Sequence, residues 1–402
     1  MKYIVGLLLL FSTSLFASDQ NASRPIKKPN SYLYQMTHII EENYIDENDS
    51  QKISSQIKRN MFEWYTSNCD HNNSATIEDL TDQWNLIEQS CPQMNKHNQH
   101  KVFNLILRDY DAAIIDMTPY KTHQKYGETG LILNRKNGEI TVIGTKDQTS
   151  ARLKKIPYGT IIQAIDDKPT NNMCLEDVWS LLGSPVGSTI SITTDKNISY
   201  LLTKELPSTP TVSHSIIENN TVIIKILSFD NDVAKNMTKI LQQLPPDMNI
   251  VLDLRNNGGG LLNSVSETLS LFVQPNTKLF SQIWRDKRYN SDSISNKKTA
   301  YIPKSIYLLI NQGTSAGALL LARVLQNENA SVIGNSQETI SQAKVVMPLN
   351  EIDALKLPIA KFYLPDGTVA SGTTVTSDIP LDTDSMDDEA LYEKIATIIK
   401  NR

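Results

Sequence analysis

The feature that most constrains the fold is a regular alternation of apolar runs and amphipathic segments in the second half of the chain. Runs rich in branched aliphatic residues predict buried strands at 221–229, 249–255 and 305–311. Each run precedes a segment with apolar residues every three or four positions, which predicts helices at 232–244, 261–273 and 317–326. Strands that alternate with helices form a largely parallel sheet, so this half predicts an α/β fold.

The first half of the chain shows two other patterns. Apolar residues at helical spacing predict helices over 31–45 and 51–65. From 130 to 204 the apolar period becomes two, which predicts strands, a hairpin around 136–138 and one short helix that stops at Gly183. The expected parts are a flexible lead-in over 18–30, a helical region over 31–117, a strand-rich domain over 118–205 and an α/β domain over 206–402.

The first 17 residues, MKYIVGLLLLFSTSLFA, are typical of a secretory signal peptide. Lys2 provides the positive start, an apolar run follows, and Ala17 is a small residue at the cleavage position; an uncleaved anchor is the alternative. Both readings predict an exported protein, periplasmic or secreted in a bacterium. No later apolar run reaches the length of a membrane span, and the net charge of −5 argues against nucleic acid as a partner.

Export makes disulfides possible, and the chain has three cysteines. Cys69 and Cys91 lie in one polar segment and are expected to bond, whereas Cys174 is expected to be a buried thiol. No spacing of Cys and His resembles a metal site, so we expect neither a metal nor another cofactor.

Several motifs resemble the carboxy-terminal processing peptidases, serine peptidase family S41. ENYIDEND at 42–49 is similar to the N-terminal helix signature of this family, and YGETGLIL at 126–133 to the entry of its inserted PDZ domain. IVLDLRNNGGGLL at 250–262 resembles its strand and Gly-rich turn, and LKLPIAKFYLPDG at 355–367 its closing strands. The resemblance implies an S41-type peptidase core of repeated βα units, an inserted PDZ domain and an N-terminal helical region.

A PDZ domain would bind a protein C-terminus or an unstructured polypeptide by strand addition, with backbone N–H groups holding the carboxylate. The resemblance places the carboxylate loop at Glu128 to Leu131, with Gly130 inside it and with Ile132 and Leu133 continuing the edge strand. The family usually has Gly where Glu128 stands. The carboxylate of Glu128 is therefore expected to weaken the binding of an anionic chain end.

The family also implies a Ser nucleophile, a Lys base and a Gly-rich turn that provides oxyanion donors, here Gly258, Gly259 and Gly260. A tight turn without chemistry is the other reading of these glycines. In the family the nucleophile lies five residues after the Asn or Asp that ends the preceding strand and ten before the Gln that closes the following helix, which are here Asn311 and Gln326. Both counts reach Ala316, which has no hydroxyl group.

The base is found by a similar count. In the family the Lys falls six residues after a Gly and eight before a Pro. Matched to Gly334 and Pro348, the resemblance places it at Ile340, and it places the supporting Gln, four residues further, at Lys344. In a shifted register, Ser315 would be the nucleophile and Lys344 its base. Otherwise Ser315 is expected to be the N-cap of the following helix.

Three functional readings follow. The first is an exported pseudopeptidase that binds protein ends without cutting them. The second is an active serine endopeptidase that uses the displaced Ser315. The third is a structural adaptor in which both pockets are closed.

Overall fold

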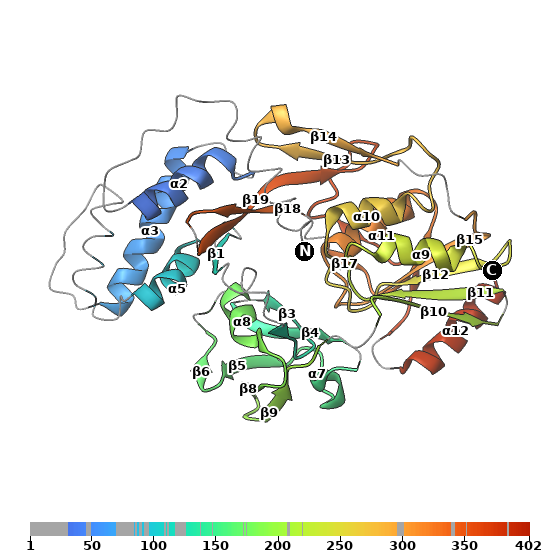
Figure 1. The fold of residues 1–402 in the computed structure, drawn as a ribbon, viewed down its shortest axis with the longest axis horizontal. Helices are drawn as coiled ribbons and strands as arrows, with labels where there is room; N and C mark the ends of the chain where they lie inside the picture. The colour runs from blue at the N-terminus through green and yellow to red at the C-terminus, as the bar shows by residue number, and fades with distance from the viewer. Residues whose placement is uncertain are drawn as a thin grey trace. The chain divides into compact units, whose positions relative to one another are not determined.

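The computed structural model describes residues 31–45, 50–69, 84, 87, 91, 96–107, 110, 112–116, 126–136, 138–146, 148–171, 173, 175–206, 210–218, 220–295, 301–338, 342–350, 352–383 and 386–402. They divide between two compact units (Figure 1). The first unit takes its described residues from 1–124, 172–177 and 344–359, and the second from 125–171, 178–343 and 360–402. The signal peptide, the lead-in, Cys174 and Ile340 lie outside the described residues.

The first unit begins with helices, as the sequence predicts. Its helices and its first strand are α2 (Ser31–Asn43), α3 (Ser50–Asn68), α5 (Lys96–Ile106) and β1 (Ala113–Asp116). Met36, Ile40, Ile53 and Ile57 are fully buried, which accounts for the apolar spacing along α2 and α3. The same unit contains the strand β18 (Gln342–Pro348) from Lys344 onward.

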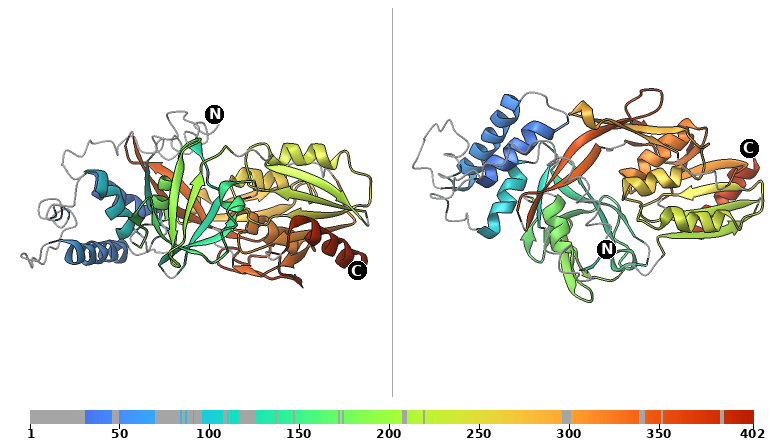
Figure 2. Two further views of the ribbon diagram at one scale, coloured as in Figure 1. Left: turned by 90° about the horizontal axis from the view of Figure 1, so that it is seen from below. Right: turned by 45° about the horizontal axis from the view of Figure 1, so that its top comes forward.

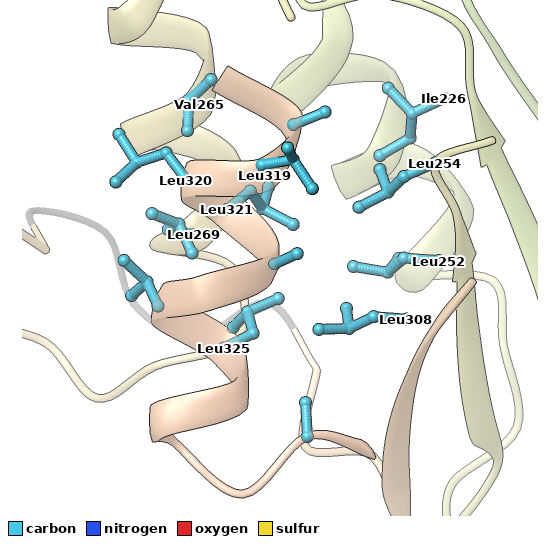
Figure 3. Packing of buried hydrophobic residues seen from close by; sticks show 14 of the residues in the cluster. Ile226, Leu252, Leu254, Val265, Leu269, Leu308, Leu319, Leu320, Leu321 and Leu325 are labelled. Atoms are coloured by element: carbon cyan, nitrogen blue, oxygen red, sulfur yellow. The ribbon is translucent and has the colours of Figure 1, made fainter. Parts of the chain in front are cut away.

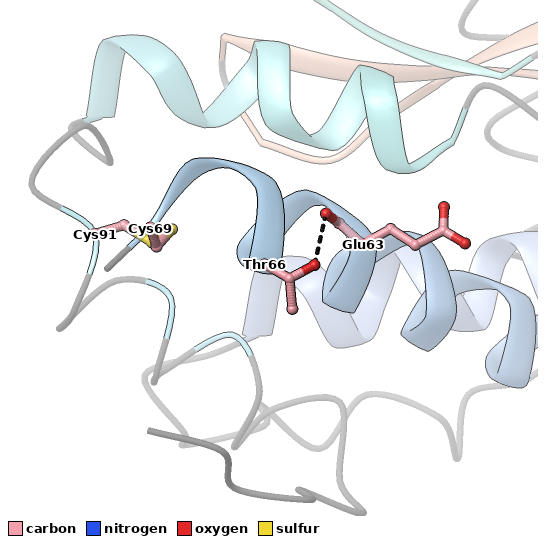
Figure 4. Close-up of a disulfide and its surroundings, with 4 residues drawn as sticks. All are labelled: Glu63, Thr66, Cys69 and Cys91. Atoms are coloured by element: carbon pink, nitrogen blue, oxygen red, sulfur yellow. Dashed lines mark hydrogen bonds between the residues drawn. A yellow bond between two sulfur atoms is a disulfide. The ribbon is translucent and has the colours of Figure 1, made fainter. Parts of the chain in front are cut away.

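A disulfide joins Cys69 and Cys91 in this unit, as the sequence predicts (Figure 4). The two Cα atoms are 5.1 Å apart, and both cysteines are buried. Cys69 follows the end of α3, where the hydroxyl group of Thr66 donates a hydrogen bond of 3.1 Å to the carbonyl of Glu63. The disulfide therefore fixes the end of α3 to Cys91, 22 residues further along the chain.

The strand-rich part of the second unit is a sheet with the strand order β3-β4-β5-β8-β9, in which β6 also pairs with β5. Its strands are β3 (Leu131–Lys136), β4 (Glu139–Thr145), β5 (Ile161–Ile165), β6 (Lys168–Pro169), β8 (Thr189–Thr194) and β9 (Ser199–Thr203). The predicted hairpin is the antiparallel pair β3–β4, and the predicted helix is α8 (Leu175–Leu182). The shorter elements here are β2 (Tyr126–Gly127), α7 (Ser150–Leu153) and β7 (Ser184–Pro185).

The α/β part contains a six-stranded sheet in the order β10-β11-β12-β15-β16-β21. All neighbouring strands are parallel except β10 and β11. The strands are β10 (Val212–Ile217), β11 (Thr221–Ile226), β12 (Asn249–Asp253), β15 (Ser305–Ile310), β16 (Ser331–Gly334) and β21 (Ile379–Pro380). The α/β fold predicted from the βα alternation is confirmed.

Helices cover both faces of this sheet because the apolar side chains of its strands alternate between the faces. The helices are α9 (Val233–Leu241), α10 (Leu262–Leu269), α11 (Gly317–Asn327) and α12 (Asp388–Lys400). Leu252 and Leu308 pack toward α10 and α11 (Figure 3), whereas Val251 and Leu309 pack with α12. Figure 2 shows α9 and α12 on opposite sides of the strands.

The remaining strands pair outside this sheet. They are β13 (Lys278–Trp284), β14 (Ser291–Ile294), β17 (Gln337–Glu338), β19 (Asp353–Tyr363) and β20 (Thr374–Val375), with the 3-10 turn η2 (Lys287–Tyr289) between β13 and β14. β19 is the alternating strand predicted near the end of the chain. It pairs antiparallel with β1 through its first residues and with β13 through its last.

Candidate functional site

The Gly-rich turn and the turn before α11 meet at the ends of two neighbouring parallel strands, β12 and β15. The Asn311 side chain joins them: its Oδ1 accepts a hydrogen bond of 2.9 Å from the Asn256 N–H, and its Nδ2 donates one of 3.0 Å to Asn256 Oδ1. The hydroxyl group of Thr314 donates to the carbonyl of Leu254 at 2.8 Å. Asn311 and Thr314 are buried, so these bonds hold both turns in one arrangement.

The Gly-rich turn depends on glycine at two positions. Gly259 and Gly260 have φ angles of +94° and +147°, a region that favours glycine. A Cβ atom on Gly260 would lie 2.3 Å from the carbonyl oxygen of Phe229. The N–H of Gly259 donates to Asn257 Oδ1 at 2.8 Å in this structure.

Ala316 has a strained backbone at the point where the chain enters α11. Its φ and ψ angles are +49° and −124°, and it is the N-cap residue of the helix. Such angles cost a non-glycine residue about 1–3 kcal/mol and occur most often at functional sites. A Cβ atom on Gly259 would lie 2.9 Å from the Ala316 methyl group. The residue that the family count identifies thus lies against the Gly-rich turn, but it carries no oxygen.

Ser315 does not cap the helix, so that prediction is wrong. The N-cap residue is Ala316, without a side-chain cap. The Ser315 N–H donates to the carbonyl of Asn257 at 2.9 Å, which holds Ser315 in the turn before the helix begins. Its carbonyl accepts a hydrogen bond of 3.1 Å from Ala318, and within the described part of the chain its hydroxyl group has no hydrogen-bond partner.

The alternative base, Lys344, lies half-buried on β18. It belongs to the first unit, whereas Ser315 belongs to the second. Among the described residues there is also no group of three or more His, Cys, Asp or Glu side chains that could hold a metal ion.

The predicted carboxylate loop immediately precedes β3, the edge strand of its sheet. Gly130 has a φ angle of +83°, and a Cβ atom there would lie 1.8 Å from Thr149 Oγ1. Leu131, Ile132 and Leu133 are all buried. The carboxylate of Glu128 forms an ion pair with the ammonium group of Lys146, so its charge is compensated rather than isolated.

The sequence did not predict a buried ion network beside the Gly-rich turn. The guanidinium group of Arg255 donates hydrogen bonds of 2.7 and 3.0 Å to the carboxylate of Asp253, which is fully buried. It also contacts Asp388 on α12, 2.5 Å away, and Asp388 binds Lys225 at 2.8 Å. Tyr392 donates from its hydroxyl group to Asp253 at 2.8 Å.

These contacts shift the protonation equilibria of the network. Burial alone would lower the pKa of Arg255, but attraction to Asp253 and Asp388 outweighs it and raises the pKa. Burial would raise the pKa of Asp388, but the positive charges of Arg255 and Lys225 lower it below its usual value. Burial and the neighbouring Asp253 raise the pKa of the Tyr392 hydroxyl group. Arg255 and Asp388 are therefore charged near neutral pH while the Tyr392 hydroxyl group keeps its proton, and their contacts fasten α12 to the end of β12.

Comparison with known proteins shows which family and fold the chain is similar to. Residues 220–381 match the model of peptidase family S41. The carboxy-terminal-processing protease of Bartonella bacilliformis is 25% identical over 272 residues, which cover 64% of this chain and 62% of the relative. CtpA, a carboxy-terminal processing protease of Bacillus subtilis, is 22% identical over 59% of this chain and 52% of its own length. The chain thus spans between half and two thirds of these relatives.

The fold comparison extends further along the chain. The photosystem II D1 C-terminal processing protease superposes with a TM-score of 0.65 at 16% identity and covers 90% of this chain and 95% of its own. An S41 protease from Bacteroides fragilis superposes with a TM-score of 0.50 at 13% identity. At these identities the likeness shows a shared fold. Among the described residues, no helix has the length and apolar character needed to span a membrane.

Proposed function

Residues 220–381 form a domain of peptidase family S41, and on this premise we propose that the protein is an exported pseudopeptidase that binds protein C-termini without cutting them. Binding is assigned to the PDZ-like domain over 118–205 and the missing chemistry to the turn around Ala316. The proposal has two separable parts, absent catalysis and retained binding.

The observation that carries the first part is the conformation of Ala316. Its strained φ angle of +49° and its position against Gly259 are typical of a residue that presents a side chain at the start of a helix. The side chain presented is a methyl group, which cannot attack a carbonyl carbon. Removing a nucleophile or a base costs a well-studied serine peptidase about 10⁶ in rate. Because Ala316 has no hydroxyl group, the turn keeps the shape of a nucleophile turn but cannot attack a peptide bond.

Ser315 does not replace the missing group. A serine hydroxyl is a weak nucleophile unless a neighbouring base accepts its proton. The Ser315 backbone is bound to Asn257 in the turn, and the second unit, as far as the structure describes it, offers its hydroxyl group no hydrogen-bond partner. A useful general base contributes about 10²- to 10⁴-fold. We therefore expect Ser315 to be inert toward amides.

The test of the first part is a peptidase assay with the full chain. We incubate wild-type protein and the Ser315→Ala variant with an unstructured protein that has an apolar C-terminus, and follow cleavage by mass spectrometry. We expect no cleavage by either form. Cleavage by the wild type that Ser315→Ala abolishes would establish the active-peptidase alternative instead.

The second part rests on the shape of the loop before β3. Gly130 adopts the positive φ angle that such a loop requires, and among the described strands β3 is hydrogen-bonded in its sheet to one neighbour, β4. A peptide can therefore pair with the outer edge of β3 by strand addition. Calorimetry with a free-acid peptide that ends in an apolar residue tests this part, and we expect weak but saturable binding. Absence of binding would support the structural-adaptor alternative.

A further inference from the structure

The ion pair between Glu128 and Lys146 lies at the loop that the proposed function assigns to the ligand carboxylate. The backbone of Glu128 is fixed, because its N–H donates to Glu205 at 2.9 Å and its carbonyl accepts from Glu205 at 3.0 Å. Its carboxylate is paired with the ammonium group of Lys146. The two side chains are 31% and 34% exposed, so water and a dissolved anion can reach both charges.

Lys146 is attached to the same loop through its main chain. Its N–H donates to the carbonyl of Gly130 at 2.8 Å, and its own carbonyl accepts a hydrogen bond of 2.6 Å from Thr149 Oγ1. Thr149 in turn fills the space beside Gly130, where a Cβ atom would lie 1.8 Å from its Oγ1. The Lys146 ammonium group is therefore held beside the loop at a fixed point of the backbone.

The loop also has hydrogen-bond donors to offer. Within the part of the chain that the structure describes, the N–H groups of Thr129 and Gly130 donate no hydrogen bond. The carbonyls of both residues are already used, by Ala151 and Lys146. The loop thus combines N–H donors with a neighbouring cation, and both favour a carboxylate. The carboxylate that the cation holds in this structure belongs to Glu128.

We propose that Lys146 is the cation that selects a free C-terminal carboxylate, and that Glu128 is an internal competitor which occupies Lys146 until a ligand displaces it. This inference rests on the proposed peptide-binding function. One carboxylate replaces another at the same ammonium group, and the released carboxylate of Glu128 is left to the surrounding water. A half-exposed pair is weak enough to be exchanged, because water already stabilises each partner.

Competition for Lys146 and simple repulsion by Glu128 predict different effects of Glu128→Gln on peptide affinity once Lys146 is removed. If Glu128 only repels the ligand, Glu128→Gln tightens binding whether or not Lys146 is present. If Glu128 competes for Lys146, Glu128→Gln tightens binding only while Lys146 remains to receive the ligand. A double-mutant cycle separates the two cases because it measures the coupling between the residues.

The experiment is calorimetry at low salt with the full chain in four forms: wild type, Glu128→Gln, Lys146→Met and the double variant. The probes are one apolar-ended peptide as a free acid and the same peptide with an amidated C-terminus. We expect Glu128→Gln to bind the free acid about fivefold more tightly than the wild type. The gain should disappear for the amidated peptide and in the double variant.

The control is Glu205→Gln, which removes the same charge from the residue whose backbone pairs with Glu128. It should leave the affinity unchanged, which excludes a general effect of net charge. Lys146→Gln repeats the cycle should Lys146→Met not fold.

The remaining outcomes overturn the inference. A double variant as tight as Glu128→Gln, or an equal gain for the amidated peptide, overturns the competition while leaving peptide binding intact. If all four forms bind the peptide with the same affinity, the competition is likewise overturned and peptide binding stands. No binding by any form overturns the proposed binding function together with the inference.

Discussion

Two ion pairs lie beside two glycine loops of the same unit, and they differ in how far they are buried. Beside the Gly-rich turn, Arg255 and Asp253 are 6% and 0% exposed and are joined by Asp388 and Tyr392. Beside the loop before β3, Lys146 and Glu128 are 34% and 31% exposed and form a single pair. Both loops contain a glycine with a positive φ angle, so their backbones are constrained in the same way.

The difference separates a structural pair from an exchangeable one. A buried charge that loses its partner is left without solvent, so the Arg255 pair has to remain intact while the domain is folded. A half-exposed charge that loses its partner gains water instead. An ion pair can therefore hold a helix in place, as the Arg255 network holds α12, or exchange its partner for a ligand, as we propose for Lys146.

The largest effect that tests this contrast is the removal of each cation. Arg255→Met leaves Asp253 buried and uncompensated, so we expect it to lower the free energy of unfolding by about 3–5 kcal/mol. Lys146→Met is the matched control, with an expected loss below about 1 kcal/mol. Urea unfolding followed by circular dichroism measures both. Equal losses would remove the distinction between the two pairs.

A smaller effect concerns the strain in the turn that the Arg255 network adjoins. Ala316→Gly relieves a backbone cost of about 1–3 kcal/mol. The substitution also gives the unfolded chain more freedom, at a cost of about 0.5–1 kcal/mol. We expect a net gain of about 1 kcal/mol in the free energy of unfolding, from the same urea experiment. A loss of stability on Ala316→Gly would contradict a strained turn.

The smallest effect is the dependence of the buried network on pH. The pKa of Asp388 is lower in the folded protein than its ordinary value of 3.8, so its ionised form stabilises the fold. This contribution is complete above the ordinary value and is lost as the pH falls below it toward the folded pKa. Asp388 is 41% exposed, which keeps the effect small.

Urea midpoints between pH 6 and pH 3 measure this dependence. Asp388→Asn should unfold with a shallower pH dependence than the wild type at the acidic end. Identical slopes for the two forms would show that the exposed side of the network contributes nothing.

The sequence predicted the features that depend on local periodicity. Continuous apolar runs identified β11, β12 and β15, because a strand that is buried on both faces of a sheet needs apolar side chains on both. The count to Ala316 identified a position whose positive φ angle then set it apart from its neighbours. The strand prediction uses information that lies within a few residues along the chain, whereas the count to Ala316 rests on the family resemblance.

The features that the sequence did not reveal join distant residues. Asp388 lies 133 positions from Arg255, and Lys146 lies 18 from Glu128, so neither partner marks the other in the sequence. The error at Ser315 has a similar origin. A serine before a helix is a typical N-cap, but the carbonyl of Asn257 binds its N–H from another turn and the helix begins after Ala316.

The bond between Cys69 and Cys91 has a consequence for the order of events during synthesis. Cys91 lies 22 residues after Cys69 in the chain. Cys174 comes a further 83 residues after Cys91 (174 − 91). A chain that enters an oxidising compartment from its N-terminus, as the proposed export implies, presents Cys69 and Cys91 there before Cys174. The entropic cost of closing a loop rises with its length, so the short loop is also the easier one to close. The order of the cysteines along the chain and the length of the loop thus favour the same pairing.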